Sequence, residues 1–410
     1  MVNSLNKPKN SRQLIIGIFL VILGLMFSFY VSSINTSDAA IWLVACALGF
    51  TLQKSRFCFA SSFRDLFLFG SGQNMKGILI ALAVSSIGFI GILIWILPNP
   101  LPGEFPSSAH VLPVGLSTIV AGIVFGVGMV VSGGCISGTI YRIAEGYVAS
   151  IITMLGVIIG AVLLIASWDF WWVNLISKES KIFLPSTFSL GYGFSLLITL
   201  IGLFLIYILV LFIESKSGIV EYKVNEIQDN NSQDLKSKLL VVFQSFFVKS
   251  WSIKLGGLSV GFLSIVYFLF HSPPGVTGEI MKLSLNISKV INLSDGVLSG
   301  IGSLSGCLGS IGSSGIISHT FVSTVGVFFG ALISALFSRE FKIRKPKEFK
   351  RYYQSLSGGV LMGYSASLGI GCTIGAFFSA IPSLSLSGWV FGFSLLLGSF
   401  IGTKIIRRFG

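Results

Sequence analysis

AGIVFGVGMVVSGGCISGTIYRIAEG, from Ala121 to Gly146, is matched in part by GGVLMGYSASLGIGCTIGAFFSAIP, from Gly358 to Pro382. When Cys135 is aligned with Cys372, four pairs of glycines also coincide: Gly122 with Gly359, Gly126 with Gly363, Gly134 with Gly371, and Gly138 with Gly375. Each segment reads as an apolar helix that carries small residues at fourfold spacing and ends in a glycine-cysteine turn. A duplicated helix that stops inside the membrane is typical of transporters built from two repeats. We therefore expect the two cysteines to face each other across a central pore.

The composition indicates a polytopic, all-α membrane protein. Of the 410 residues, 53% are hydrophobic and only 10% are charged, whereas soluble domains carry about 25% charged residues. The net charge of +13 is also found in proteins that bind nucleic acid. However, the basic residues cluster in short loops between apolar runs, which membrane topology explains better. We expect no nucleic-acid partner and no cleaved signal peptide, because the first apolar run is long enough to span the bilayer.

Ten apolar runs approach the length of about 20 residues that a helix needs to cross a bilayer. They lie near residues 14–34, 40–53, 75–97, 113–132, 147–167, 188–213, 251–270, 319–337, 352–371 and 386–403. The second run is short, and we interpret it as a broken helix that continues into the following turn. Lys and Arg concentrate before the first run, between the eighth and ninth, and at the C-terminus, whereas the loop 98–113 has neither. The positive-inside rule then places both termini in the cytoplasm.

Polar segments divide the chain. Residues 1–39 form an N-terminal segment with one extra transmembrane helix, 40–213 a first membrane half, 214–250 a charged cytoplasmic linker, and 251–410 a second half. The two halves are expected to be pseudo-symmetric, with broken or re-entrant helices that carry the glycine-cysteine turns. The stretch from Ser299 to Ser314 is almost all Gly, Ser and Leu. We expect it to be unwound or re-entrant and buried in protein.

The stretch KSRFCFASSFRD, from Lys54 to Asp65, places a cysteine and two arginines between apolar runs. One interpretation is a cytoplasmic turn whose basic side chains reach toward water. The other is a re-entrant turn in which Cys58 lines a pathway and Arg64 pairs with Asp65 to fix the loop, because ionisable residues at membrane depth usually mark a pathway.

The first glycine-cysteine turn has the features of an anion site. Glycines on both sides of Cys135, among them Gly134, allow a sharp turn that brings N–H groups close to a ligand, and the following helix N-terminus attracts anions. Arg142 and Glu145 stand three residues apart, so on a helix they share one face and can pair. The alternative is a packing helix with a bystander cysteine. The repetition of the pattern at Gly371 and Cys372 favours the functional interpretation.

The remaining reactive residues carry weaker signals. Cys46 lies among apolar residues of a helix and is expected to pack or face lipid, and the role of Cys307 stays open. No carboxylate stands at metal-ligand spacing from the histidines, which are far apart in sequence (His110, His271 and His319), so we expect no metal site. Methionines near both cysteine turns leave a soft Cu(I) site as a minor alternative. No nucleotide-binding motif is present, and we expect no cofactor.

Four motifs occur in order: RFCFASSFRD, FGVGMVVSGGCISGTIYRIAEG, FSREFKIR and GGVLMGYSASLGIGCTIG. This succession resembles the YeeE/YedE family, the sulphur-transport family of bacterial and archaeal inner membranes, and the resemblance runs from about Gln53 to Thr403. It implies an all-α fold of two pseudo-symmetric halves with broken helices converging from both faces. It also implies thiosulfate uptake, with selenium metabolism for some members, and pathway thiols at Cys58, Cys135 and Cys372.

The resemblance further suggests a small cytoplasmic sulfurtransferase as a partner. This chain departs from compact members of the family by its added N-terminal helix and its longer linker. Its second turn, from Gly375 to Pro382, is more similar to the YedE branch.

Thiosulfate is a small dianion with a soft terminal sulfur, and these properties suggest a mechanism. A cysteine S–H is a weak donor, so a line of thiols can pass the anion without holding it tightly. The thiols must stay protonated, which is expected from a free-thiol pKa of about 8.5. Backbone N–H groups, Arg64 and Arg142 would offset the remaining charge. We expect a transporter and not an enzyme.

Three alternatives stay open at this point. The cargo is a selenium compound or another sulfur species, or the protein is a membrane thiol enzyme or sulfur carrier that forms a persulfide. A purely structural scaffold is the third, although it leaves the duplicated cysteine turns unexplained.

Overall fold

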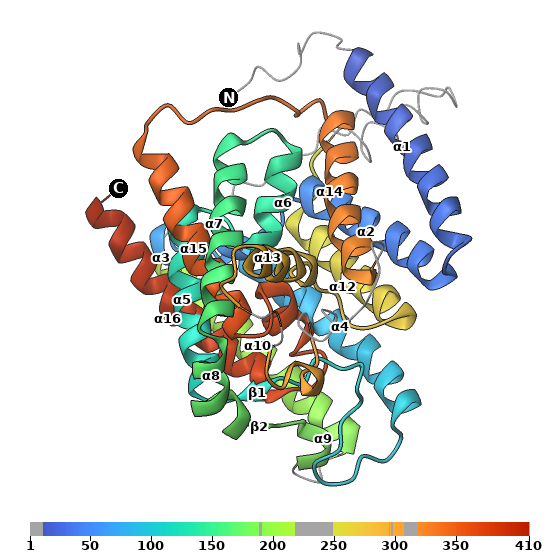
Figure 1. The fold of residues 1–410 in the computed structure, drawn as a ribbon, viewed down its shortest axis with the longest axis vertical. Coiled ribbons are helices and arrows are strands. Elements are labelled where there is room, and N and C mark those ends of the chain that lie inside the picture. The colour runs from blue at the N-terminus through green and yellow to red at the C-terminus, as the bar shows by residue number, and fades with distance from the viewer. Residues whose placement is uncertain are drawn as a thin grey trace.

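The computed structural model describes residues 11–187, 191–217, 249–294, 296, 298–306 and 318–409, and these are predominantly helical (Figure 1). The long helices are α1 (Ser11–Ser32), α2 (Thr36–Lys54), α4 (Gln73–Ile96), α5 (Leu116–Ser132), α7 (Val148–Ala166), α10 (Gly191–Ser217), α12 (Ile253–Phe270), α14 (His319–Phe337), α15 (Lys350–Leu368) and α16 (Leu386–Phe409). The shorter ones are α3 (Phe59–Leu68), α6 (Ile136–Ala144), α8 (Trp168–Asn174), α9 (Leu184–Thr187) and α13 (Gly278–Val290). The remaining described elements are a π-helical turn (Thr373–Ser379), two 3₁₀ turns (Ile176–Lys178 and Ile301–Ser303) and a two-stranded ribbon of β1 (Pro113–Val114) and β2 (Ser180–Lys181).

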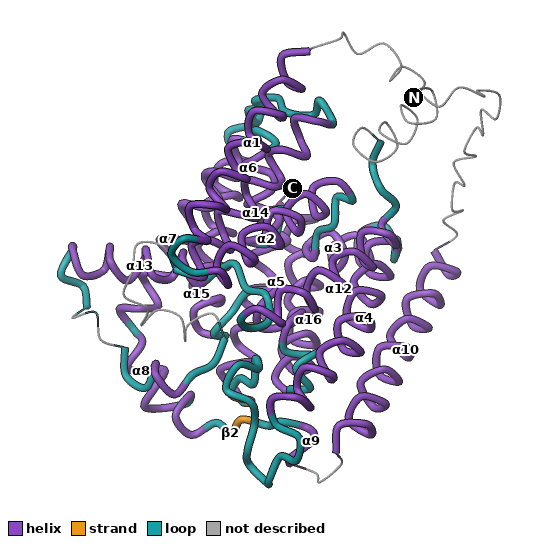
Figure 2. The backbone as a smooth tube through the Cα atoms, turned by 90° about the vertical axis from the view of Figure 1, so that its right-hand side faces the viewer, coloured by secondary structure: helices purple, strands orange, loops and turns teal. Residues whose placement is uncertain are grey.

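The long helices account for the predicted membrane crossings. Within the described residues, nine helical segments are long and apolar enough to span a membrane, and a tenth results if α15 and the π-helical turn, bent by 49°, form one span. Figure 2 shows α4, α10, α12 and α16 as roughly parallel helices. The prediction of an all-α, multi-pass membrane protein is confirmed. The short second run is α2, and together with α3 it forms one candidate span of 33 residues.

The central helices pack through glycines. α15 packs on α7 and α5, and α16 packs on α5. A Cβ atom at Gly363 of α15 would clash with the carbonyl of Val157 on α7, and one at Gly160 of α7 would clash with the carbonyl of Val360 on α15. Apolar side chains gain little by leaving lipid, so membrane helices associate mainly through close packing. Small residues permit this close approach of the two backbones. The fourfold glycine spacing therefore serves packing as well as the turns that follow.

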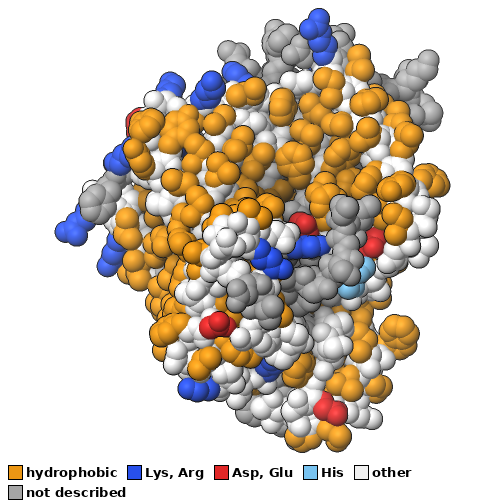
Figure 3. All heavy atoms as spheres, viewed as in Figure 1, with side chains coloured by type: hydrophobic (Ala, Val, Ile, Leu, Met, Phe, Trp, Pro, Cys, Tyr) orange, Lys and Arg blue, Asp and Glu red, His pale blue; other side chains and the backbone are white. Residues whose placement is uncertain are grey.

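The outer helices present apolar side chains to the surroundings. In α1 and α10, only 17% of the most hydrophobic window is buried within the protein. Hydrophobic side chains accordingly cover much of the surface shown in Figure 3. Such a surface is expected where lipid is the solvent.

The proposed domain boundaries stay a prediction. α1 packs on α14 and α2, so the extra helix contacts elements from both predicted halves. Most of the predicted linker lies outside the described residues. Of the Gly/Ser stretch, the described part holds a 3₁₀ turn at Ile301–Ser303, and Cys307 lies outside the described residues. Cys46 was expected either to pack or to face lipid, and in the structure it packs against the core.

Replacing Gly363 with leucine should destabilise the protein, because the new side chain would force α15 away from α7. Overpacking of a tight interface costs about 1–3 kcal/mol, so we expect a clearly lower melting temperature of the detergent-solubilised protein. Gly91→Leu is the matched control, since a Cβ at this position on α4 meets nothing within 4 Å. Equal melting temperatures for the two variants would contradict the packing role.

Candidate substrate pathway

The central feature of the site is a break between α5 and α6. α5 ends at Ser132, and Gly133 follows with φ +80°, a left-handed conformation that glycine adopts readily. The carbonyls of Val131 and Ser132 accept hydrogen bonds from the Arg351 guanidinium at 3.2 and 2.5 Å. The carbonyl of Gly133 accepts one from Arg142. Two arginines from different helices therefore satisfy the carbonyl groups that the break would leave without partners.

Cys135 is held at the start of α6. It occupies the N-cap position, and its sulfur accepts a hydrogen bond from the backbone N–H of Gly138 at 3.3 Å. The hydroxyl of Ser137 lies 3.2 Å from the same sulfur. The side chain is fully buried. The thiol is thus fixed in position by the turn and by the first residues of α6.

Cys58 lies against Cys135. It precedes α3, where its carbonyl accepts hydrogen bonds from the hydroxyls of Ser61 and Ser62 at 2.9 and 3.0 Å. The two thiols are hydrogen-bonding neighbours on either side of Gly138. A Cβ at Gly138 would lie 3.1 Å from the Cys58 sulfur and 3.3 Å from that of Cys135. A side chain at this position would therefore crowd both sulfurs.

Cys58 is a neighbour of Cys135 that the alignment of Cys135 with Cys372 did not include, and the facing of Cys135 and Cys372 stays a prediction. Within the described residues, Cys58 is the cysteine next to Cys135. Sequence alignment of the two glycine-cysteine turns contained no information on this third segment.

Cys372 lies in the second turn, between α15 and the π-helical turn, and is fully buried. The hydroxyl of Thr277 is its neighbour. Two hydroxyls in this region, those of Thr277 and Thr373, are buried without a hydrogen-bond partner. Unpartnered buried hydroxyls are rare in folded proteins, so these two are candidate donors for a ligand. The carbonyl of Gly375 lies 3.2 Å from Nδ1 of His110.

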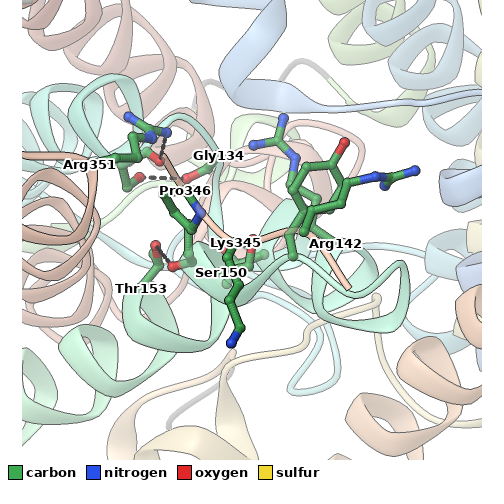
Figure 4. Close-up of a pocket in the computed structure, with 12 residues that line it drawn as sticks. Gly134, Arg142, Ser150, Thr153, Lys345, Pro346 and Arg351 are labelled. Atoms are coloured by element: carbon green, nitrogen blue, oxygen red, sulfur yellow. Dashed lines mark hydrogen bonds between the residues drawn. The ribbon is translucent and has the colours of Figure 1, made fainter. Parts of the chain in front are cut away.

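A basic cavity opens next to the first turn. It has a volume of about 260 Å³, and Gly134, the neighbour of Cys135, forms part of its wall. Figure 4 shows Arg142 and Arg351 on opposite sides, with Gly134 between them. The cations that line the cavity are Arg142, Arg344, Lys345 and Arg351. The paired thiols thus lie directly behind the wall of a positively charged chamber.

Comparison with known proteins now identifies the family. The sequence profile of the Sulphur transport family matches residues 54–401. This chain belongs to that family. It is a multi-pass membrane protein of a transport family and not of an enzyme family.

Individual relatives agree with the family match. The chain is similar to the thiosulfate transporter TsuA of Spirochaeta thermophila, with 27% identity over 89% of this chain and 98% of that protein. It is also similar to the thiosulfate transporter TsuA of Escherichia coli, with 23% identity over 88% and 92%. A probable transporter, YedE of Escherichia coli, is 29% identical over 50% of this chain and 48% of its own length.

Two charge pairs were expected, and one of them is confirmed. Arg64 pairs with Asp65 at 2.8 Å. Arg142 and Glu145 do not pair, which corrects the expectation from their spacing. Arg142 is drawn to the carbonyl of Gly133, whereas Glu145 accepts a hydrogen bond from Gln53 at 2.9 Å. Arg142 therefore donates to the carbonyl of Gly133 at the broken helix and not to the carboxylate three residues away.

Glu145 belongs to a polar cluster that fastens the loop after α14. Burial is the main cause that raises the pKa of Glu145, and the nearby Glu340 adds to it. Gln53 bridges the two carboxylates, with Nε2 3.1 Å from Glu340, and Arg344 donates its backbone N–H to the carbonyl of Gly146 at 2.8 Å. The cluster holds Arg344 and Lys345 at the cavity, so Glu145 acts at a distance from the thiols.

Sequence reasoning missed two parts of the site. The sequence analysis counted Arg351 only among the Lys and Arg between the eighth and ninth apolar runs. It is the second residue of α15, and this position directs its side chain toward the break. It lies close enough to Arg64 and Arg142 for their charges to repel its own. The histidines, far apart in sequence, line one cavity on the other side of the protein. Within the described residues, no cluster of His, Cys, Asp or Glu is suited to hold a metal ion.

Replacing Arg351 with glutamine should loosen the first turn, since the carbonyls of Val131 and Ser132 would lose their donors. With about 1 kcal/mol for each hydrogen bond, the modification of Cys135 by neutral methyl methanethiosulfonate should accelerate about 5- to 30-fold. The measurement is site-resolved mass spectrometry of the labelled, solubilised protein.

Lys347→Gln is the control for this experiment, because it removes an exposed positive charge from the same loop. The neutral reagent makes the comparison insensitive to charge itself. The same rate for Cys135 in both variants would show that Arg351 does not hold the turn.

Proposed function

We propose that this protein imports thiosulfate across the cytoplasmic membrane along a path that passes Cys372, Cys58 and Cys135. The observation that carries the proposal is the contact between the buried Cys58 and Cys135 thiols directly behind the basic cavity. Relatives named thiosulfate transporters match nearly the full length of the chain, which supports thiosulfate over other sulfur compounds.

Neutral thiols suit the passage of a soft dianion. Each S–H donates a weak hydrogen bond, so no single site binds the anion tightly enough to stop conduction. At Cys135 the sulfur accepts the N–H of Gly138, and the Ser137 hydroxyl and the Cys58 thiol are its other polar neighbours, so a passing anion would replace one of these neighbours as the acceptor for the S–H hydrogen. A thiolate in the same place would repel it. The path therefore works with protonated cysteines and without covalent chemistry.

The basic cavity provides an anion-attracting site at the cytoplasmic end of the path. Its four cations attract a dianion that leaves the thiols, and the loop that supplies Arg344 and Lys345 is rich in Lys and Arg, which places it in the cytoplasm by the positive-inside rule. Arg142 lies close enough to the Cys58 and Cys135 sulfurs to interact with them. Anions are thus drawn past the thiols toward the cytoplasm. A small sulfurtransferase that receives the anion there stays a prediction from family resemblance.

Removing a thiol should reduce transport strongly. Loss of one hydrogen bond to a charged ligand corresponds to about 1.5–3 kcal/mol, so Cys58→Ala and Cys135→Ala should each lower the initial uptake of sulfur-labelled thiosulfate about 10- to 100-fold. Cys135→Ser should keep part of the activity, because a hydroxyl still donates. The measurement uses cells that lack their own thiosulfate carriers, at equal expression of each variant.

Cys46→Ala is the matched control and should transport normally, since this cysteine packs in α2 away from the path. Full uptake by Cys135→Ala would contradict the thiol pathway. No uptake of thiosulfate by the unmodified protein would move the cargo to a selenium compound or another sulfur species.

The covalent alternative has its own test. If the protein were a sulfur carrier, exposure to thiosulfate would leave a persulfide on Cys58, Cys135 or Cys372. We expect mass spectrometry of the alkylated protein to find only unmodified thiols after exposure. A persulfide at a stoichiometric level would contradict noncovalent passage and would support a covalent relay of sulfur instead.

A further inference from the structure

A second cavity lies at the end of the protein opposite the basic cavity. It has a volume of about 410 Å³ and opens where α12 ends and α14 begins. His271 follows the last residue of α12, and His319 is the first residue of α14. Their rings stack with centroids 4.0 Å apart, and His110 lines the same cavity. Histidine side chains that reach the surface are pale blue in Figure 3.

The charge of this cavity differs from that of the basic one. No Lys or Arg occurs among the described residues that line it. The carboxylate of Asp38 lies against Nδ1 of His319 behind the wall, an ion pair only when that ring is protonated, and Glu279 accepts hydrogen bonds from the hydroxyls of Ser318 and Thr320 at 2.9 and 3.1 Å. With neutral histidines, these two carboxylates would leave the cavity unfavourable for an anion. A positive charge here has to come from a protonated imidazole.

The cavity adjoins the second cysteine turn. His110 lies on its wall and contacts the carbonyl of Gly375, three residues after Cys372. The hydroxyl of Ser379 in the π-helical turn donates to the carbonyl of Pro274 at 2.7 Å, and Pro273 and Gly275 line the cavity. The wall of the cavity therefore contacts the segment that follows Cys372.

We propose that this cavity is the capture site for the dianion and that each capture takes up one proton on His271. The inference deepens the proposed function and rests on it. The stacked pair explains the limit of one proton, because two positive charges 4.0 Å apart repel strongly. A dianion entering the cavity stabilises the charged ring and so raises its proton affinity.

The resting state of the histidines agrees with this assignment. Burial, together with the neighbouring His319, lowers the pKa of His271 below its ordinary value, so the ring is neutral at pH 7 until an anion arrives. Burial lowers the pKa of His110 to about 4, which keeps that ring neutral throughout the physiological range. The charged or titratable groups that face the stacked pair are Asp38 on α2, Glu279 on α13, Tyr267 on α12 and His110 in the loop before β1.

The direction of the pH dependence of anion binding follows from the lowered pKa of His271. Protonated His271 is scarce at neutral pH and becomes more abundant as the pH falls, so anion binding strengthens in acid. Thiosulfate itself stays a dianion over this range and adds no pH dependence. The KM for thiosulfate should be about 5- to 10-fold lower at about pH 5.5 than at about pH 7.5.

The test is uptake of sulfur-labelled thiosulfate into proteoliposomes with the same pH on both sides, so that no proton gradient contributes. We expect the pH dependence of KM in the unmodified protein and a flat profile in His271→Gln, which keeps a polar side chain but cannot carry the charge. His110→Gln is the matched control. It should keep the ratio of KM values between the two pH values, whatever its maximal rate.

The outcomes separate the two proposals. A constant KM in the unmodified protein, or an unchanged pH response in His271→Gln, would overturn proton-linked capture and leave thiosulfate transport in place. Loss of the response in His110→Gln but not in His271→Gln would overturn the assignment to His271. No uptake at either pH would overturn the proposed function and this inference together.

Discussion

The interruption of α5 at Gly133 is the constraint on which the centre of this protein depends. A helix that stops inside a membrane leaves carbonyl groups that lipid cannot satisfy. Here Arg142 and Arg351 satisfy them, from α6 and α15. The repair brings two guanidinium groups to a depth where charges are costly. Because each is held by carbonyl oxygens, both remain at the wall of the cavity, so the groups that complete the broken helix also supply the positive charge of the proposed pathway.

The glycines connect packing with the geometry of the site. Gly160 and Gly363 bring the backbones of α7 and α15 into contact, which fixes the position of Arg351 relative to the end of α5. Gly138 has a different task, because it leaves room for the Cys58 and Cys135 sulfurs on its two sides. A larger residue at Gly138 would separate the thiols without disturbing the helix pairs. Glycine therefore allows two helices to come close at one place and two thiols to come close at another.

The fold was predictable from the sequence, whereas the partners within the site were only partly so. Apolar length and the paired glycine-cysteine motifs predicted the crossings and the breaks, because both signals are local. The contact between Cys58 and Cys135 was not predictable from the repeat, since Cys58 lies outside it. The Arg142–Glu145 pair was wrong for a related reason: helical spacing describes two side chains, but not the open carbonyl of Gly133 that competes for one of them. The histidine cavity depends on the ends of α12 and α14, which only tertiary structure brings together.

The two cavities differ in how their positive charge is supplied, and the difference follows from what each end must do. Arginine is charged at all physiological pH values, so the basic cavity attracts anions permanently. Permanent cations at both ends of a narrow path would hold a dianion on each side and slow its movement, because conduction needs sites that also release. Imidazole provides a positive charge that is removed when the ring loses its proton. In the proposed pathway, an entry lined by histidines and an exit lined by arginines would attract the anion with different strengths, with the weakly donating thiols between them.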